Sequence, residues 1–253
     1  MVINLRHHLA SAWAHVSDQW AARHQDTGPR RRVKDAPMRS FHWLFAACFT
    51  LAYLTSETEK LRMLHVTMGY TLVGLLAFRL VYGVVGPRHA NIGALWRKAK
   101  GLPHWVRQTS AQLATPTSGP AINWRQGYLM VTPVATLLIL ALVAPIALSG
   151  YATFNELGGD WLQDALGEVH EFFGNFMLFT VLGHLAWLVV LSLLTKRNEA
   201  SPMYSGTVAG AGPDLVQHNR LWLGIAVVLG VVLYVAWEWQ NSPNGLIRWS
   251  ALF

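Results

Sequence analysis

Cysteine is almost absent from this sequence, since Cys48 is the only one in 253 residues. A disulfide framework, a Cys-x-x-Cys metal pair and a Cys-x-x-Cys-His attachment motif each need at least two cysteines, so all three are excluded. Charged residues are also scarce, at 13% of the chain, whereas soluble domains have about a quarter. The scarcity of charge excludes an ordinary water-soluble domain.

Apolar residues, in contrast, make up 53% of the chain. They gather in blocks near the length of about 20 residues that a helix needs to cross a hydrocarbon layer about 30 Å thick. We therefore predict an all-α integral membrane protein whose transmembrane helices span residues 38–55, 64–85, 128–148, 169–194 and 221–239. The first block begins only at Met38, behind a long basic stretch, so we interpret it as a permanent span and not as a cleaved signal peptide.

The net charge of +7 is unevenly distributed between the two sides of this arrangement. Of the nineteen Lys and Arg residues other than Arg79, sixteen fall on one side, namely seven up to and including Arg39, six between the second and third blocks and three between the fourth and fifth. Cytoplasmic loops carry such an excess. We therefore expect a cytoplasmic N-terminus and a periplasmic C-terminus, and we attribute the positive charge to topology and lipid attraction, not to nucleic-acid binding.

The N-terminal arm, residues 1–37, has its own periodicity. Its larger apolar residues recur at steps of three and four, and its basic residues lie mostly elsewhere on the helix; the apolar set is Val2, Leu5, Leu9, Trp13, Val16 and Trp20. This pattern is typical of an amphipathic helix at a membrane surface. A helix packed against the cytoplasmic loops would show the same pattern, and both interpretations stay open.

Four of the eleven histidines, His42, His65, His170 and His184, fall inside the predicted spans. An ionisable side chain at membrane depth is costly and usually functional, although a hydrogen bond to a neighbouring helix could explain any single one. The predicted topology places His65 and His170 at the outer level and His42 and His184 at the cytoplasmic level. His170 and His184 are fourteen residues apart, which is about 21 Å along a helix and nearly the same face.

Two histidines at each level are the axial ligands that a haem iron takes from facing helices. We therefore predict two haem b groups, one between His65 and His170 and one between His42 and His184. Gly69 and Gly174 each follow an outer histidine by four residues and would clear the same helix face for a flat ring. Close helix packing is the alternative explanation for both glycines.

Arg79 is the only Lys or Arg well inside a predicted span. It lies fourteen residues after His65, and therefore on nearly the same face and one level deeper. The guanidinium could pair with a propionate of the inner haem. It could instead extend to the nearby cytoplasmic surface.

Several short segments resemble the prokaryotic cytochrome b561 family, which includes the b-type cytochrome subunits of nickel-iron hydrogenases and, more distantly, of formate dehydrogenase. They are Phe41-His42-Trp43, Leu64-His65 through Gly69-Tyr70, Phe78-Arg79-Leu80, Gly86-Pro87-Arg88-His89-Ala90 and Val169-His170-Glu171 through His184. The resemblance implies a four-helix haem-binding bundle over residues 38–195, with His42, His65, His170 and His184 as ligands. The arm at 1–37 and a linker, fifth transmembrane helix and tail at 196–253 are additions to that core.

The resemblance also implies a function. Family members pass electrons between a quinone in the bacterial inner membrane and a periplasmic partner, such as a dehydrogenase, a hydrogenase or cytochrome c. We expect this chain to do so as a subunit of a hetero-oligomeric complex, because its additions suggest a partner surface. The alternatives are a self-contained quinone oxidoreductase, such as a superoxide oxidase, and a non-redox helical anchor or transporter. For the quinone we expect a position near His89 and Asn91, which could otherwise be cap or loop residues.

Overall fold

The computed structural model describes residues 28–114, 122, 124–242 and 246. The predicted amphipathic helix of the arm lies in residues 1–27, outside these ranges. The long helices are α2 (Ala36–Thr55), α3 (Arg62–Val85), α6 (Trp124–Phe154), α7 (Asp160–Thr195) and α9 (Leu221–Asn241). The shorter elements are β1 (Arg30–Arg32), η1 (Glu59–Leu61), η2 (Arg88–Ala90), α4 (Ile92–Ala99), α5 (Leu102–Ala114), α8 (Ser201–Ser205) and β2 (Thr207–Ala209).

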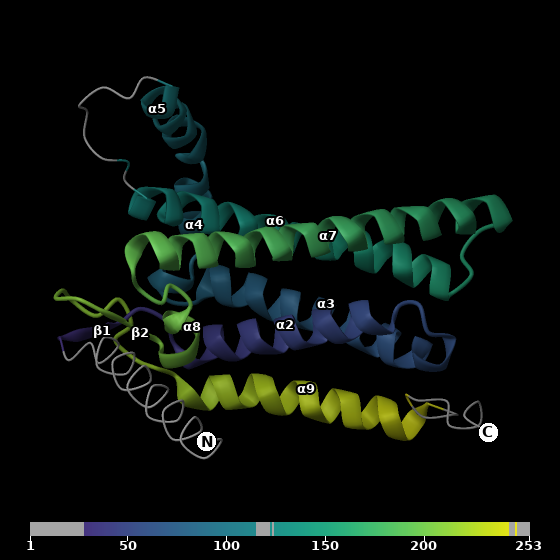
Figure 1. Cartoon of the computed structure of the whole chain (residues 1–253). Coiled ribbons are helices and arrows are strands. Elements are labelled where there is room, and N and C mark those ends of the chain that lie inside the picture. The colour runs from purple at the N-terminus through teal and green to yellow at the C-terminus, as the bar shows by residue number, and fades with distance from the viewer. Residues whose placement is uncertain (1–27, 115–121, 123, 243–245, 247–253) are drawn as a thin grey trace, which may run out of the picture.

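The long helices form one bundle in which neighbours run alongside each other (Figure 1). Helix α6 packs against α7, α2 packs against α3, and α3 also contacts α6, which joins the two pairs. Helix α9 lies against α2. We call the end that holds β1, β2 and α8 the sheet end, and the opposite end, where α2 connects to α3 and α6 to α7, the far end (Figure 1).

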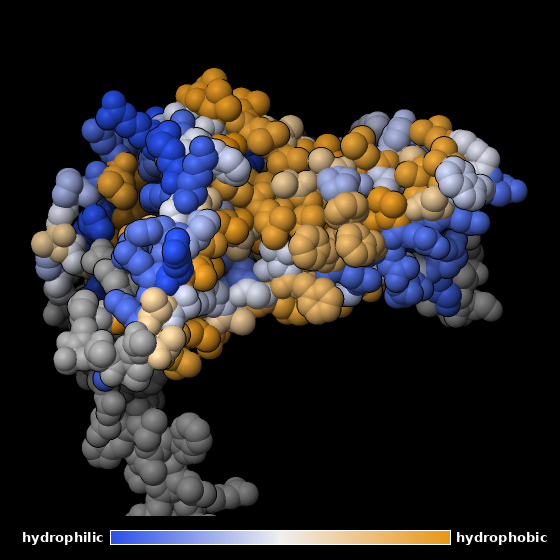
Figure 2. All heavy atoms as spheres, turned by 90° about the horizontal axis from the view of Figure 1, so that it is seen from above, coloured by the Kyte–Doolittle hydropathy of each residue, from blue (hydrophilic) through white to orange (hydrophobic). Residues whose placement is uncertain are grey.

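Four helical segments in the described part of the chain are long and apolar enough to cross a membrane: Glu59–Val85, Leu129–Phe154, Asp160–Thr195 and Leu221–Asn241. The surface is accordingly apolar along the middle of the bundle and hydrophilic toward its ends (Figure 2). Helix α2 has 20 residues but is not in this set, and its first turns include the polar Arg39, Ser40 and His42. That α2 also crosses the membrane therefore stays a prediction.

Helix α7 begins at Asp160, nine residues before the start predicted from hydropathy at residue 169. Its 36 residues give a length of about 54 Å, more than the 40–45 Å of a whole bilayer. The first turns mix Asp160, Asp164 and Glu168 with apolar residues, so the helix continues where the apolar block does not. A hydropathy boundary marks the edge of the membrane and not the end of the helix.

The described residues also contain a small sheet, which the all-α prediction did not include. Strand β1 pairs antiparallel with β2, with Arg31 opposite Val208. The backbone N–H groups of Val33 and Lys34 both donate to Gly206 O, at 2.8 and 3.0 Å, and extend this connection. The sheet joins the segment before α2 to the segment after α8, although the prediction assigned these segments to separate parts of the chain.

The hydrophobic core lies in the middle of the bundle. Its buried side chains come from α2, α3, α6 and α7 and include Phe45, Met68, Leu72, Val143 and Met177. Met177 is seven residues from both His170 and His184, and only 1% of its surface is exposed. The two histidine levels are therefore separated by a dry, packed layer.

Candidate functional site

The two far-end histidines lie next to each other. His65 stands at the start of α3, and His170 stands ten residues after the first residue of α7. Their ring centroids are 5.8 Å apart, and the ring planes are inclined at 72°. Since a bond from imidazole to a first-row metal is about 2 Å long, this separation leaves room for one metal atom between the two rings.

Each far-end ring is held by a backbone carbonyl of another helix. His65 Nδ1 lies 2.8 Å from Ala52 O in α2, and His170 Nδ1 lies 2.9 Å from Ile146 O in α6. A carbonyl oxygen only accepts hydrogen bonds, so each Nδ1 carries the proton and donates it. The Nε2 atom of each ring then keeps its lone pair, as a metal-binding neutral imidazole requires.

The absence of a side chain at Gly150 in α6 leaves the space in which the ring of His170 lies. A Cβ atom at this position would lie 2.7 Å from Cε1 and 2.8 Å from Nδ1 of that ring. Such distances are shorter than any normal contact, so a larger residue would displace the imidazole. The sequence analysis missed Gly150, and its only signal was a glycine inside an apolar span.

The sheet-end pair, His42 and His184, is less fully bonded. His42 lies in α2 and His184 in α7, both half-buried, and they are close enough for a charge on one ring to act on the other. The Nδ1 atom of His184 is buried and has no hydrogen-bond partner. The structure thus brings the predicted residues to two levels, but only at the far end are both rings fixed by hydrogen bonds.

The glycines next to the histidines face open space. A Cβ atom added at Gly69, Gly174 or Gly183 would meet nothing within 4 Å. At Gly83, by contrast, it would lie 2.5 Å from the side chain of Ile92. The first three glycines therefore leave room for a flat ring beside the histidines, whereas Gly83 serves close packing.

Arg79 is buried, with 1% of its surface exposed, so the expectation that it could extend to the surface is wrong. One amino group, Nη1, donates to Ala90 O at 3.0 Å, while Nε has no partner. Burial and the nearby charges of Arg79 and Lys98 lower the pKa of Lys34. The ammonium group of Lys34 is in turn close enough for its charge to act on the ring of His42. Lys34 thus brings a positive charge near His42, and Asp35 is the acidic group beside Lys34 and Arg79.

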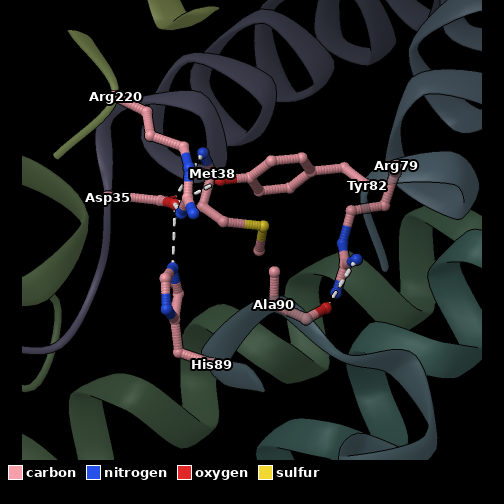
Figure 3. A network of polar contacts seen from close by, with 7 residues as sticks. All are labelled: Asp35, Met38, Arg79, Tyr82, His89, Ala90 and Arg220. Carbon is pink, nitrogen blue, oxygen red and sulfur yellow. Dashed lines mark hydrogen bonds and ion pairs between the residues drawn. The ribbon is translucent and has the colours of Figure 1, made fainter. Parts of the chain in front are cut away.

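Beside Arg79, a buried carboxylate connects four segments of the chain (Figure 3). Asp35 precedes α2 and caps it, because its Oδ1 accepts from Met38 N at 3.3 Å. Its Oδ2 accepts from the hydroxyl of Tyr82 in α3 and lies 2.8 Å from His89 Nε2 in η2. Arg220, just before α9, completes the cluster at 3.8 Å.

The hydrogen bonds of this cluster change the acidity of Asp35. Burial alone would raise the pKa of its carboxyl, but the hydrogen bonds from His89 and Tyr82 stabilise the anion and hold the pKa below its usual value. Asp35 is completely buried. The sequence analysis missed it, although an Asp followed two residues later by Pro37 is a recognisable helix start.

His89 and Asn91, where we expected a quinone, both have structural partners. His89 binds Asp35, and the Asn91 side chain caps α4 by accepting from Ala94 N at 2.9 Å. The cap and loop roles, which we had kept as alternatives, account for both residues. The structure gives no support to that position for the quinone.

The donor set fits a haem better than a bare ion. Within the described ranges, no three His, Cys, Asp or Glu side chains gather so that they could hold a metal ion. Two imidazoles per level, with open space over Gly69 and Gly174, are what a tetrapyrrole needs, because it supplies the other four ligands itself.

A family model described as prokaryotic cytochrome b561 matches residues 33–206. The match includes all four histidines and the helices α2, α3, α6 and α7 that carry or support them. It ends before α9. No curated protein and no solved structure matches the chain.

Proposed function

Because the chain belongs to the prokaryotic cytochrome b561 family, we propose that it holds two haem b groups, one between His65 and His170 and one between His42 and His184. Haem b binding and electron transfer across a membrane follow from the family. The number of haems and the pairing of ligands are our proposal. The observation that supports it is the far-end pair, whose rings lie 5.8 Å apart with both Nδ1 atoms bonded to carbonyls.

When bound, haem iron gains and loses single electrons. The chain supplies neutral imidazoles, which add no charge to the membrane interior, and carbonyls of Ala52 and Ile146 that fix the orientation of two of them. The packed layer around Met177 keeps water out of the space between the levels. Arg79 and Lys34 would hold the propionates of the sheet-end haem by charge-assisted hydrogen bonds.

We place the protein in the bacterial inner membrane, with the sheet end in the cytoplasm. The excess of Lys and Arg at this end supports the orientation. A single cysteine introduced at Gly159, at the far end, should react with a membrane-impermeant reagent applied from outside. One introduced at Lys98 should not, and the reverse result would invert both levels.

The electrons would pass between a membrane quinone and a periplasmic redox protein, with this chain as one subunit of a complex. The first turns of α7 support an external partner, because the helix is longer than the bilayer is thick and projects at the far end. The exposed Trp161 and Leu162 lie on this projection. Co-purification of a second chain, lost when both residues are changed to Ser, would support this assembly, and an active single chain would contradict it.

A reduced-minus-oxidised absorbance spectrum together with a haem-to-protein ratio tests the central proposal. We expect two haems per chain with the spectra of bis-histidine b-type centres. One haem per chain would disprove the two-level arrangement. A colourless protein from cells that supply haem would disprove the whole proposal.

A further inference from the structure

A groove lies between α3 and α9, and none of the four proposed histidine ligands lines it. Its volume is about 430 Å³, within the range of small-molecule sites. It is lined by Tyr70, Thr71, Gly74, Leu75 and Phe78 of α3 and by Val227, Gly230, Val231 and Tyr234 of α9. Both helices are candidate membrane spans, so the groove lies at membrane depth.

Glycines shape the groove. Helix α9 approaches the start of α2 closely at Gly224, where a Cβ atom would lie 3.0 Å from Cβ of Ala36. Gly74 and Gly230 face open space instead, since a Cβ atom at either would meet nothing within 4 Å. At Gly74 and Gly230, therefore, neither wall of the groove carries a side chain, and the space stays free for a ligand.

Polar groups gather at one end of the groove only. Tyr70 and Tyr234 both line this end, and Glu238 follows Tyr234 one turn further along α9. Thr71 apart, the remaining lining is apolar or glycine, from Leu75 and Phe78 on one wall to Val227 and Val231 on the other. A ligand that matches this groove has a ring with hydrogen-bonding oxygens at one end and a hydrocarbon chain at the other.

The polar end is adjacent to the far-end histidines. Tyr70 is five residues after His65 in α3, which is about 7.5 Å along the helix. The ring of Tyr70 contacts the ring of Tyr151, with 6.4 Å between their centroids. Tyr151 follows Gly150, against which the ring of His170 lies. One layer of aromatic side chains thus separates the groove from the proposed haem site.

We propose that this groove binds an isoprenoid quinone, with the quinone ring at Tyr70 and Tyr234 and the tail along Gly74 and Gly230. The inference rests on the proposed function and gives its quinone a place at the far end, in contrast to the cytoplasmic position predicted from the sequence. The hydroxyl of Tyr70 can donate to a quinone carbonyl, and the carboxylate of Glu238 can accept from a quinol hydroxyl. A lipid acyl chain has neither group, so it would leave this polar end unused.

The test is an equilibrium binding measurement on the full-length, haem-loaded chain in phosphatidylcholine nanodiscs. The probe is decylubiquinone, followed by calorimetric titration, and the haem absorbance of each sample reports folding. Gly230→Leu places a side chain in the groove, and we expect it to weaken binding by about tenfold or more. Ala226→Leu adds a bulky side chain on the exposed face of α9 and should leave binding within about twofold of the unmodified chain.

Two conservative variants examine the polar end. Tyr70→Phe and Glu238→Gln each remove one hydrogen-bonding group without filling the groove, and we expect each to weaken binding about two- to tenfold. Tyr204→Phe, at an exposed position in α8, is the matched control and should have no effect.

Unchanged binding in Gly230→Leu would place the quinone elsewhere and overturn the inference. Weakened binding in Gly230→Leu with no effect of Tyr70→Phe or Glu238→Gln would identify the groove as a site for a hydrocarbon chain alone, and would overturn it too. If Gly230→Leu lost its haem, this variant would be misfolded, and binding by Tyr70→Phe and Glu238→Gln would then decide whether the quinone occupies the groove. Haem missing from the unmodified chain would disprove the proposed function whatever the quinone titration shows.

Discussion

The far-end and sheet-end histidine pairs look equivalent in the sequence, but they differ in the structure. At the far end, both imidazoles donate to backbone carbonyls, and their rings lie together. In the part of the chain that the structure describes, six buried side-chain atoms at the sheet end lack a hydrogen-bond partner, namely Arg39 Nε, Arg79 Nε, Thr132 Oγ1, His184 Nδ1, Trp187 Nε1 and Asn219 Oδ1. At the far end, Thr153 Oγ1 lacks one.

The difference indicates how each site becomes complete. A buried polar atom without a partner costs roughly 1–3 kcal/mol, so the sheet end is unfavourable until another group meets these atoms. The far-end histidines carry no such cost, because the Nδ1 atoms of both rings already donate to carbonyls. We infer that the far-end site is organised by the protein, whereas the sheet-end site is completed by its haem.

The largest expected effect is the loss of haem when the proposed histidine ligands are changed in pairs. Changing both His65 and His170 to Ala should leave about one haem per chain, because the second change acts on a site that is already empty. Changing His65 and His184 should remove both haems. Haem content and spectra measured in intact membranes distinguish these outcomes, and a single site formed by His42 with His170 would show that the levels were wrongly assigned.

Among the described glycines, only Gly150 lies against a histidine ring, that of His170 at the far end. Filling this space should therefore affect only the far-end haem. Gly150→Leu would place side-chain atoms where His170 now lies, so we expect loss of most of the far-end haem with retention of the other. Ala141→Leu is the matched control, because Ala141 is exposed in the same helix and lies nine residues before Gly150, on the opposite face. Equal loss of both haems in Gly150→Leu would mean that the two sites do not form independently.

The buried charge of Arg79 should influence the sheet-end haem most. Arg79→Gln removes a positive charge that stabilises the reduced, more negative state, so the midpoint potential of this haem should fall by about 60 mV or less. Arg97→Gln, on the exposed surface of α4, is the control. A redox titration that showed the larger shift at the far-end haem would contradict the placement of Arg79.

Changes in the cluster around Asp35 should have the smallest effect on haem, because the cluster links helices at the sheet end and contains none of the proposed ligands. Asp35→Asn should leave the spectrum unchanged but lower the free energy of unfolding at neutral pH by about 1–3 kcal/mol. Because the hydrogen bonds of His89 and Tyr82 lower the pKa of Asp35 below its ordinary value of 3.8, the stabilisation is present above that value. It is lost as the pH falls through the still lower pKa of the folded state.

Thermal release of haem at a series of pH values measures this contribution. The difference between Asp35→Asn and the unmodified chain should be constant near neutral pH, begin to shrink near pH 3.8 and disappear below the still lower pKa of the folded state. Asp164→Asn, at an exposed position in α7, is the control. A difference that grew as the pH fell would show that the Asp35 carboxyl is protonated in the folded protein.

The sequence predicted the positions of the long helices well, because each contains an apolar block of helical length. Hydropathy placed the start of α9 at Leu221, where the structure has it. The spacing of His170 and His184 gave their common face. The bonds that fix the far-end rings were not predictable, since Ala52 and Ile146 contribute only backbone carbonyls, which every residue has.

The Asp35 cluster escaped prediction for a related reason. Asp35, Tyr82, His89 and Arg220 come from four separate segments, and each alone resembles an ordinary cap, span or loop residue. Only the packing of α2, α3, η2 and α9 brings the four together. The small sheet was missed because two three-residue strands carry too little periodicity to be recognised.

Helix α7 carries one proposed ligand of each haem, with thirteen residues between them, and this arrangement constrains which sequence changes the segment can accept. Substitutions between His170 and His184 leave the direction of both imidazoles unchanged. A single inserted or deleted residue would rotate one imidazole by about 100° relative to the other and move it by about 1.5 Å along the axis. The segment should therefore vary freely in the identity of its lipid-facing residues and not at all in its length.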